Sequence, residues 1–232
     1  MDSYTLIDHI AHSAKQTPVK VTLKGRLNSE IQHLKGFYGD GNFGLLYCSL
    51  DEWECLQKKH AQLIDDFILE CDRRNSALPL ADLTRYPARI EPGAIIREYV
   101  EIGEGAVIMM GAIINLGSVV GKGTMIDMNV VLGGRAQVGE NCHIGAGAVL
   151  AGVIEPPSAE PVIVEDNVLV GANAVITEGV RVGHHSVIAA GSVVLDHVEP
   201  YSVYAGVPAR KVKEVDNKTL SKTQLVQALR NL

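Results

Sequence analysis

The chain has 232 residues, of which 47% are hydrophobic and 21% charged, a composition typical of a globular protein. Its formal net charge of −6 argues against nucleic acid as the main partner. No run of about 18 apolar residues could span a membrane, and the segment MDSYTLIDHIAHSAK lacks the basic start and apolar core of a signal peptide.

The four cysteines form no C-x-x-C pair and have no regular spacing. They are Cys48, Cys55, Cys71 and Cys142. We therefore expect reduced thiols in a cytoplasmic protein, and neither a disulfide framework nor a zinc site.

Residues 1–87 alternate between helical spacing and short apolar runs. SYTLIDHIAHSA (3–14) and LDEWECLQKKHAQLIDDFILECDRRNSA (50–77) both have the apolar spacing of an amphipathic helix. In the second segment the residues on one face are Trp53, Leu56, Leu63, Ile64, Phe67 and Ile68. Between the two segments, VKVTLKG (19–25) and FGLLYC (43–48) are predicted strands, bounded by glycine-rich turns. This pattern predicts a small N-terminal α/β cap.

From Ile90 to Leu150 a branched aliphatic residue recurs at every sixth position, and the series resumes from Val164 to Val194. A period of six belongs neither to a helix nor to a strand. The residue four positions after each aliphatic is often Ala, Ser, Thr or Cys. Each hexad is best explained as a very short strand and a bend, with three hexads making one triangular coil. Since a single coil cannot bury its own apolar side, residues 88–211 are predicted to form a mainly β fold of stacked coils, a parallel β-helix.

The step from Leu150 to Val164 is fourteen residues, one hexad plus eight more. Pro156, Pro157 and Pro161 stiffen this insertion. It is either a tolerated surface loop or a flap over a groove between subunits, because long loops on rigid scaffolds often carry function. Residues 212–232 turn polar and are predicted to form a closing helix over the open end of the solenoid.

Residues 88 to about 210 resemble the left-handed β-helix of hexapeptide-repeat acyltransferases, and the left-handed sense is implied by this resemblance. Within that group RIEPGAIIR, GTMIDMN, NCHIG, AGVIEPPSAEP and the cap segment GDGNFGLL resemble the tetrahydrodipicolinate N-acetyltransferase family of the diaminopimelate route to lysine. The resemblance implies acetyl-CoA as co-substrate, a dicarboxylate acceptor with a free amino group, and no tightly bound cofactor or metal. It also implies a homotrimer with active sites between neighbouring subunits.

Three residues are candidates for acid–base chemistry. Asp127 lies in GTMIDMN, where the sister succinyltransferases have an active-site aspartate, and it could orient the amine or accept its proton. Glu178 lies in ITEG, three residues after Val175, which occupies the position of the succinyltransferase glutamate. His143 resembles the histidine base of sugar acetyltransferases with this fold. The alternatives are a turn aspartate, a solvated glutamate and a surface histidine.

The resemblance also implies binding residues. Arg89, Arg97 and Met110 match the succinyltransferases, and Asn115, eighteen residues after Arg97, should stack on it at the same corner. Arginine can hold a carboxylate through two hydrogen bonds, although a solvated arginine at a coil corner is the alternative.

The acyl-CoA site is assigned to two regions. Gly152, Ala172 and Ala190 are expected near the acyl group or the pantetheine chain, and Glu178 should lie one coil after Gly152 in the same column. YAGVPARKVK (204–213) resembles the A-G-x-P-A-[KR] turn of CoA-dependent members. The residues of this turn are Gly206, Pro208, Arg210 and Lys211, whose cations could meet a nucleotide phosphate.

Other functions remain open at this stage. Succinyl-CoA could replace acetyl-CoA, or a sugar or serine could be the acceptor on the same fold. A carbonic-anhydrase-like metal hydratase would need histidine spacings that the repeats lack. A non-catalytic scaffold would not bind acetyl-CoA, and the AGVPAR turn and the proline-rich insertion argue against it.

Overall fold

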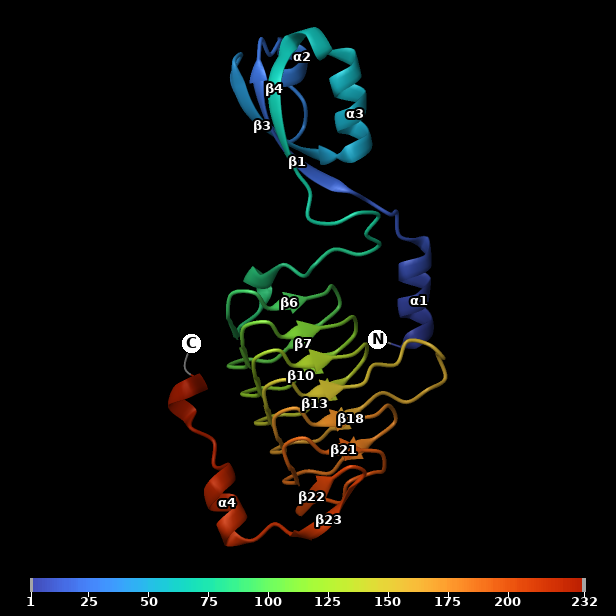
Figure 1. Cartoon of the computed structure of the whole chain (residues 1–232), viewed down its shortest axis with the longest axis vertical. Helices are drawn as coiled ribbons and strands as arrows, with labels where there is room; N and C mark the ends of the chain where they lie inside the picture. The colour runs from blue at the N-terminus through green and yellow to red at the C-terminus, as the bar shows by residue number, and fades with distance from the viewer. Residues whose placement is uncertain (1, 231–232) are drawn as a thin grey trace. The chain divides into compact units, whose positions relative to one another are not determined.

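The computed structural model of the chain describes residues 2–230 and contains two compact units. One unit is His12–Leu78, and the other combines Pro79–Leu232 with the N-terminal segment Met1–Ala11 (Figure 1). The cap therefore covers less of the chain than the expected range 1–87. The helix α1 (Ser3–His12) is present as predicted, but up to Ala11 it groups with the β-helical unit.

The unit His12–Leu78 is an antiparallel sheet with strand order β2-β3-β1-β4, covered on one face by helices. Its elements are β1 (Pro18–Gly25), α2 (Ser29–Gln32), β2 (Phe37–Gly39), β3 (Phe43–Ser49), α3 (Leu50–Lys59), η1 (Ala61–Leu63) and β4 (Ile64–Glu70). Both strands predicted in this region are present, and Trp53 of α3 is buried among the side chains of β1 and β3.

The helix predicted over residues 50–77 is wrong beyond Lys59. There α3 ends, and Ile64–Glu70 forms the strand β4, which pairs with β1 along Lys20–Gly25. Isoleucine and phenylalanine suit a strand as well as a helix face, so local spacing could not decide between the two. The free edge of β1 decides, because its backbone groups need partners.

Seventeen two-residue strands lie within Arg89–Val194 of the described chain, and the second residue of each belongs to the six-residue aliphatic series. Each strand pairs in parallel with the strands three before and three after it, so that three sheets enclose the interior. The predicted fold, a parallel β-helix of hexapeptide repeats with an N-terminal α/β region and a short C-terminal helix, is confirmed.

We number the faces of this β-helix by their sheets. Face 1 contains β5 (Arg89–Ile90), β8 (Val107–Ile108), β11 (Met125–Ile126), β14 (His143–Ile144), β17 (Leu169–Val170) and β20 (Val187–Ile188). Face 2 contains β6 (Ile95–Ile96), β9 (Ile113–Ile114), β12 (Val131–Leu132), β15 (Val149–Leu150), β18 (Val175–Ile176) and β21 (Val193–Val194). Face 3 contains β7 (Glu101–Ile102), β10 (Val119–Val120), β13 (Gln137–Val138), β16 (Ile163–Val164) and β19 (Arg181–Val182).

The turns between faces form three edges. Edge 1–2 consists of residues 91–94, 109–112, 127–130, 145–148, 171–174 and 189–192. Edge 2–3 consists of 97–100, 115–118, 133–136, 177–180 and the insertion 151–162. Edge 3–1 consists of 103–106, 121–124, 139–142, 165–168 and 183–186.

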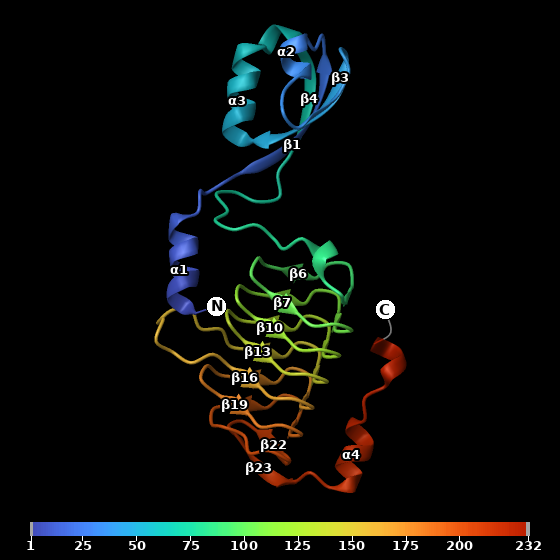
Figure 2. The same ribbon diagram turned by 180° about the vertical axis from the view of Figure 1, so that it is seen from behind.

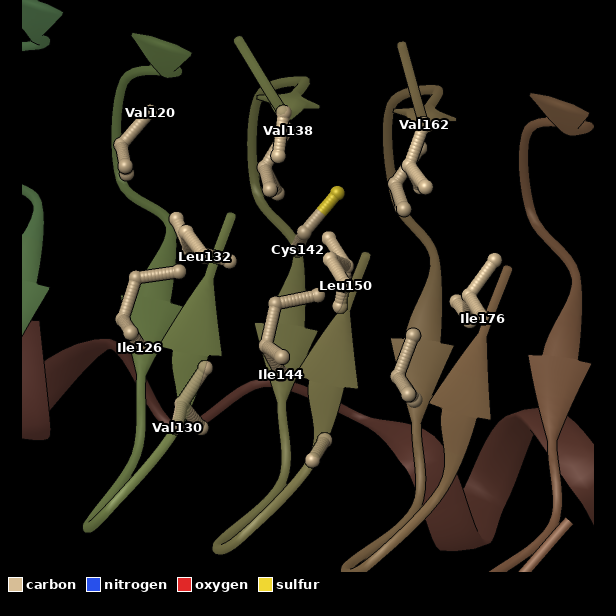
Figure 3. Close-up of a cluster of buried hydrophobic side chains, with 14 of the residues drawn as sticks. Val120, Ile126, Val130, Leu132, Val138, Cys142, Ile144, Leu150, Val162 and Ile176 are labelled. Atoms are coloured by element: carbon tan, nitrogen blue, oxygen red, sulfur yellow. The ribbon is translucent and has the colours of Figure 1, made fainter. Parts of the chain in front are cut away.

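The core is a column of aliphatic side chains stacked from coil to coil. Ile126 and Ile144 are fully buried on face 1, while Leu132 and Leu150 project from face 2 into the same interior (Figure 3). Burying such a side chain contributes about 1.5–3 kcal/mol, so each coil is held chiefly by its neighbours. The small residues predicted at the corners are buried as well; they include Ala106, Ala112, Ser118, Thr124, Ala136, Cys142, Ala148, Ala174, Ser186 and Ser192.

The C-terminal part runs differently from the prediction. A hairpin of β22 (Ser202–Gly206) and β23 (Ala209–Glu214) extends the sheet of face 1. α4 (Asn217–Thr223) and the 3₁₀ turn η3 (Gln227–Arg230) then return beside the coils (Figures 1 and 2). Arg230 Nε donates to the Gly123 carbonyl on edge 3–1 at 2.8 Å, so this segment runs beside the coils at that edge and does not close the open end as expected.

One further 3₁₀ turn, η2 (Leu83–Arg85), precedes the first coil. Among residues 2–230, no helix is both long and apolar enough to cross a bilayer.

Candidate active site

Two of the predicted acid–base residues lie side by side where face 1 meets edge 1–2. Met125 pairs with His143 in neighbouring coils, and the backbone N–H of Asp127 donates to the Ile144 carbonyl at 2.9 Å. This register places the Asp127 carboxylate beside the imidazole, with Oδ2 3.6 Å from His143 Nε2. Both side chains are partly open to solvent, with 21% and 33% of their surfaces exposed.

The distance of 3.6 Å is too long for a hydrogen bond but within ion-pair range. The other oxygen of the same carboxylate, Oδ1, accepts the Met128 N–H at 2.8 Å, which fixes the side chain on its turn. Catalytic hydrogen bonds are often long without substrate and shorten when it binds. The pair can therefore orient an imidazole that exchanges a proton, with the carboxylate stabilising its charged form.

Arg89 is on face 1 but remote from this pair. Strand register stacks Arg89 on Val107, Val107 on Met125 and Met125 on His143, so three coil spacings separate the arginine from the histidine. At roughly 4.8 Å per coil this is about 14 Å. Arg89 Nε lies 3.4 Å from Glu91 Oε1, within its own turn.

Met110, Ala172 and Ala190 lie on edge 1–2, the same edge as Asp127. Met110 is 44% exposed, and Ala190 follows Ala172 by one coil, as the pairing of β17 with β20 requires. The second position of these turns thus holds a methionine in the early coils, Met110 and Met128, and an alanine in the later ones, Ala146, Ala172 and Ala190. An extended ligand could approach the backbone most closely along the later coils.

The remaining predicted residues of the coils lie on edge 2–3. The N–H groups of Arg97 and Asn115 donate to the carbonyls of Ile114 and Leu132, one coil further on in each case, so Arg97 and Asn115 stack as expected. The Asn115 side-chain oxygen accepts the Leu116 N–H at 2.8 Å, which leaves its amide NH₂ group turned away from that turn.

Gly152 begins the insertion at a point where two coils come unusually close. A Cβ on Gly152 would stand 2.2 Å from the backbone nitrogen of Gly134, so no larger residue fits there. The pairing of β15 with β18 sets Glu178, which is exposed, one coil after Gly152 in the same column, as predicted from the length of the insertion.

Face 2 separates these two groups of residues. Asp127 and His143 lie at one border of that face, whereas Gly152 and Glu178 lie at the other. A single copy of the chain therefore does not bring the two groups together, and any site that uses both needs two copies.

The β22–β23 hairpin holds the last group. Gly206 and Pro208 form its turn, and Arg210 is largely exposed, with Nη1 3.4 Å from Asp196 Oδ2. The Lys211 ammonium donates hydrogen bonds to the carboxylates of Glu199 and Glu214, and these bonds raise the pKa of Lys211 above its usual value. Since Lys211 already faces two carboxylates at 2.6 Å each, Arg210 is the freer cation for a phosphate.

The sequence reading missed Arg135 on edge 2–3. Its guanidinium donates to Ser3 Oγ in α1 and to the Ala159 carbonyl in the insertion. The sequence does contain a signal for this residue: the third position of neighbouring turns holds glycine or asparagine, as at Gly117 and Asn129, so an arginine at this position is unusual.

Comparison with known proteins identifies the family. A family model described as tetrahydrodipicolinate succinyltransferase N-terminal matches residues 1–83. A model of the bacterial transferase hexapeptide matches 117–152, and one of the hexapeptide repeat of succinyl-transferase matches 161–196. The 2,3,4,5-tetrahydropyridine-2,6-dicarboxylate N-acetyltransferase of Thermotoga sp. (strain RQ2) is 63% identical over 232 residues, with 100% of both chains covered.

The chain belongs to the tetrahydropyridine-dicarboxylate N-acetyltransferase family. A second member of this N-acetyltransferase family, from Bacillus pumilus, is 58% identical over 236 residues and covers 100% of this chain and 99% of its own. Among solved structures, the perosamine N-acetyltransferase of Caulobacter crescentus, in complex with CoA and GDP-perosamine, has 27% identity and a TM-score of 0.49. It covers 55% of this chain and 58% of its own.

Proposed function

We propose that this chain transfers the acetyl group of acetyl-CoA to the amino group of ring-opened tetrahydrodipicolinate, a step of lysine biosynthesis by the diaminopimelate route. The observation that carries the proposal is the Asp127–His143 pair, a carboxylate beside an imidazole on an open edge, in a chain that matches these N-acetyltransferases over its whole length. No bound metal or permanent cofactor is needed for this chemistry.

In the proposed reaction the unprotonated amine nitrogen attacks the thioester carbonyl, and His143 accepts an N–H proton as the C–N bond forms. Asp127 holds the imidazole in place and stabilises its cation, while backbone N–H groups at the turns hold the tetrahedral oxyanion. The C–S bond breaks as the amide C–N bond is completed, and the proton on His143 passes to the departing CoA thiolate.

The proposed site lies between copies of the chain, with edge 1–2 of one subunit facing edge 2–3 of its neighbour. Glu178 and Gly152 would then border the acyl group, while Arg97 and Asn115 are proposed to bind the substrate carboxylates with Arg89 and Met110 at the rim. Ala172 and Ala190 would border the pantetheine chain, and Gly206, Pro208, Arg210 and Lys211 would bind its nucleotide.

A homotrimer is proposed because face 2, which separates the two edges, presents only aliphatic side chains outward. These are Ile95, Ile113, Val131, Val149, Val175 and Val193. Ile95 and Ile113 are 44% and 41% exposed in the single chain, whereas face 3 presents Glu101, Gln137 and Arg181. A continuous apolar strip of this kind marks a protein interface. Light scattering should give three times the chain mass of 24.9 kDa.

The decisive experiment measures CoA release from acetyl-CoA and, separately, from succinyl-CoA, with tetrahydrodipicolinate as acceptor. Acetyl-CoA should be the better donor. Asp127→Asn and His143→Gln should each lower kcat at least about 100-fold, the usual scale for a proton-transfer group. The double variant should be scarcely worse than either single variant, because the two side chains act as one unit.

His184→Gln is the matched control, since His184 lies on edge 3–1, away from the proposed site. It should keep near-normal turnover. Normal turnover in either of the other two single variants would remove that residue from the mechanism, and losses that add in the double variant would show that the two residues act separately.

A further inference from the structure

The N-terminal helix α1 packs against the residues at the third turn position of edge 2–3, which we call the docking track. Tyr99, Gly117 and Arg135 occupy this position in three successive coils, with φ of 61°, 69° and 66°. The ring of Tyr99 lies 5.2 Å from that of His9 in α1. Leu6, which is fully buried, approaches Gly117 so closely that a Cβ there would be 2.9 Å from Leu6 Cδ1.

Arg135 completes the track with a hydrogen bond to Ser3 Oγ. The contact residues of α1 are spaced by three, and three residues of a helix advance about 4.5 Å. Neighbouring coils are about 4.8 Å apart. The helix and the column therefore stay in register over three coils, as the position of α1 beside these coils indicates (Figures 1 and 2).

Arginine is an unusual residue for its backbone position. Nine non-glycine residues within 2–230 have positive φ, and five of them are asparagine, which tolerates this conformation. An arginine there is disfavoured, and disfavoured backbone conformations persist where the surroundings hold them in place, often at functional sites. The contacts of its guanidinium indicate what that function is.

The Arg135 guanidinium spans the base of the insertion. Nη1 donates to the Ala159 carbonyl at 3.2 Å, near the end of the insertion, and to the Val153 carbonyl at 3.5 Å, near its start. The coils also hold both ends of the insertion, since the N–H of Val153 donates to the Gly134 carbonyl and the Glu160 carbonyl accepts from the N–H of Gly179. Only the tip 154–158 extends beyond the arginine.

We propose that Arg135 is a positioning residue, which closes the base of the insertion 151–162 so that its tip forms one wall of the acyl-CoA groove beside Gly152. The helix α1 holds this arginine through Ser3. The inference rests on the proposed function, because the wall has a purpose only if acetyl-CoA binds there.

Arg135→Gly is the test variant, because glycine adopts this backbone conformation at no steric cost and the change removes only the side chain. Asn167→Gly is the matched control: Asn167 also has positive φ, at 59°, but lies on edge 3–1 away from the insertion. Hydrogen exchange of a peptide covering 151–162 should become at least about 10-fold faster in Arg135→Gly and stay unchanged in the control. A peptide covering 107–114, which contains neither substituted position, serves as the internal reference.

In the kinetic arm, Arg135→Gly should raise the KM for acetyl-CoA about 10-fold while kcat changes less than about threefold, since no reacting atom touches the guanidinium. Arg135→Lys should recover part of the exchange protection, and Ser3→Ala should show a smaller version of both effects. Exchange and KM equal to those of the control would overturn the proposal.

The two arms separate this inference from the proposed function. If the native chain shows no turnover with tetrahydrodipicolinate, the proposed function fails, but hydrogen exchange still reports whether Arg135 closes the loop. If turnover is normal and exchange is fast in Arg135→Gly with an unaltered KM, the closed loop has no part in acyl-CoA binding and the inference fails alone.

Discussion

Replacing Thr124 by valine should destabilise the β-helix although valine is the more apolar residue. Thr124 is fully buried at edge 3–1, and its hydroxyl donates to the Gly139 carbonyl at 2.6 Å and accepts the Cys142 N–H at 2.9 Å. In most other turns these two backbone groups bond directly, as Ala106 N–H does with the Gly103 carbonyl at 3.2 Å. Here the threonine hydroxyl is inserted between them and links two coils.

Valine has the same shape but leaves both backbone groups without a partner. Each buried unsatisfied group costs about 1–3 kcal/mol, and a partial closing of the turn would return some of this, so we expect a loss of about 2–3 kcal/mol. For a chain of this size that corresponds to a thermal midpoint lower by roughly 5–10 °C. Thr124→Ser keeps the hydroxyl and removes one methyl, which costs about 1 kcal/mol.

The measurement is thermal unfolding of the native chain and both variants at one protein concentration, because the midpoint of an oligomer depends on concentration. Valine should be clearly worse than serine. If valine unfolds at the native temperature, or serine is the worse of the two, the hydroxyl bridge does not stabilise the coil and packing alone governs this corner.

Two further predictions concern the stability of the β-helix at buried positions. Gly133→Ala would put a Cβ 2.0 Å from the Gly152 backbone nitrogen, so the free energy of unfolding should fall by about 3 kcal/mol or more. The control is Gly105→Ala, where the Cβ would meet open space and only the φ of 68° is unfavourable, so the loss should be about 1–2 kcal/mol. Equal losses in the two variants would contradict the argument. Burial raises the pKa of Cys142 to about 11 from 9.0. Above about pH 9 the unfolded thiol loses its proton and the folded one does not, so stability should fall by about 2–3 kcal/mol towards pH 11. Denaturant titrations should show this fall in the native chain relative to Cys142→Ala, and parallel pH profiles would refute it.

The β-helix could be predicted from sequence because the same six-residue pattern of aliphatic residues recurs in every coil. Ile108, Ile126 and Ile144 recur at a spacing of eighteen, and each position sees the same neighbours in the next coil, so local pattern and tertiary contact coincide. In the strand β4 they do not coincide. Its apolar residues fit a helix as well as a strand, and only the free edge of β1, about forty residues earlier, selects the strand.

The same reasoning separates the predicted site residues from the missed one. The sequence indicates Asp127 and His143 as separate candidates, yet the period of the coils already implies that they are close. Asp127 stacks on Gly145 in the next coil, and His143 lies two residues before Gly145. Arg135 could not be found this way. Its partner Ser3 is 132 residues away in a helix outside the repeat, and no periodicity relates the two.

The fold itself restricts where chemistry can occur. Each strand contributes one inward residue that must be aliphatic and one outward residue on a flat face, so the exposed turn residues are the positions freest to carry function. On this chain those turns form separate columns, and the two that hold Asp127 and Glu178 border the only face whose outward residues are all aliphatic within Arg89–Val194. Covering that face with further copies would bury its apolar strip and bring the two columns into one groove. Assembly and catalysis would then depend on the same surface, and a separated subunit would keep its fold but lose its site.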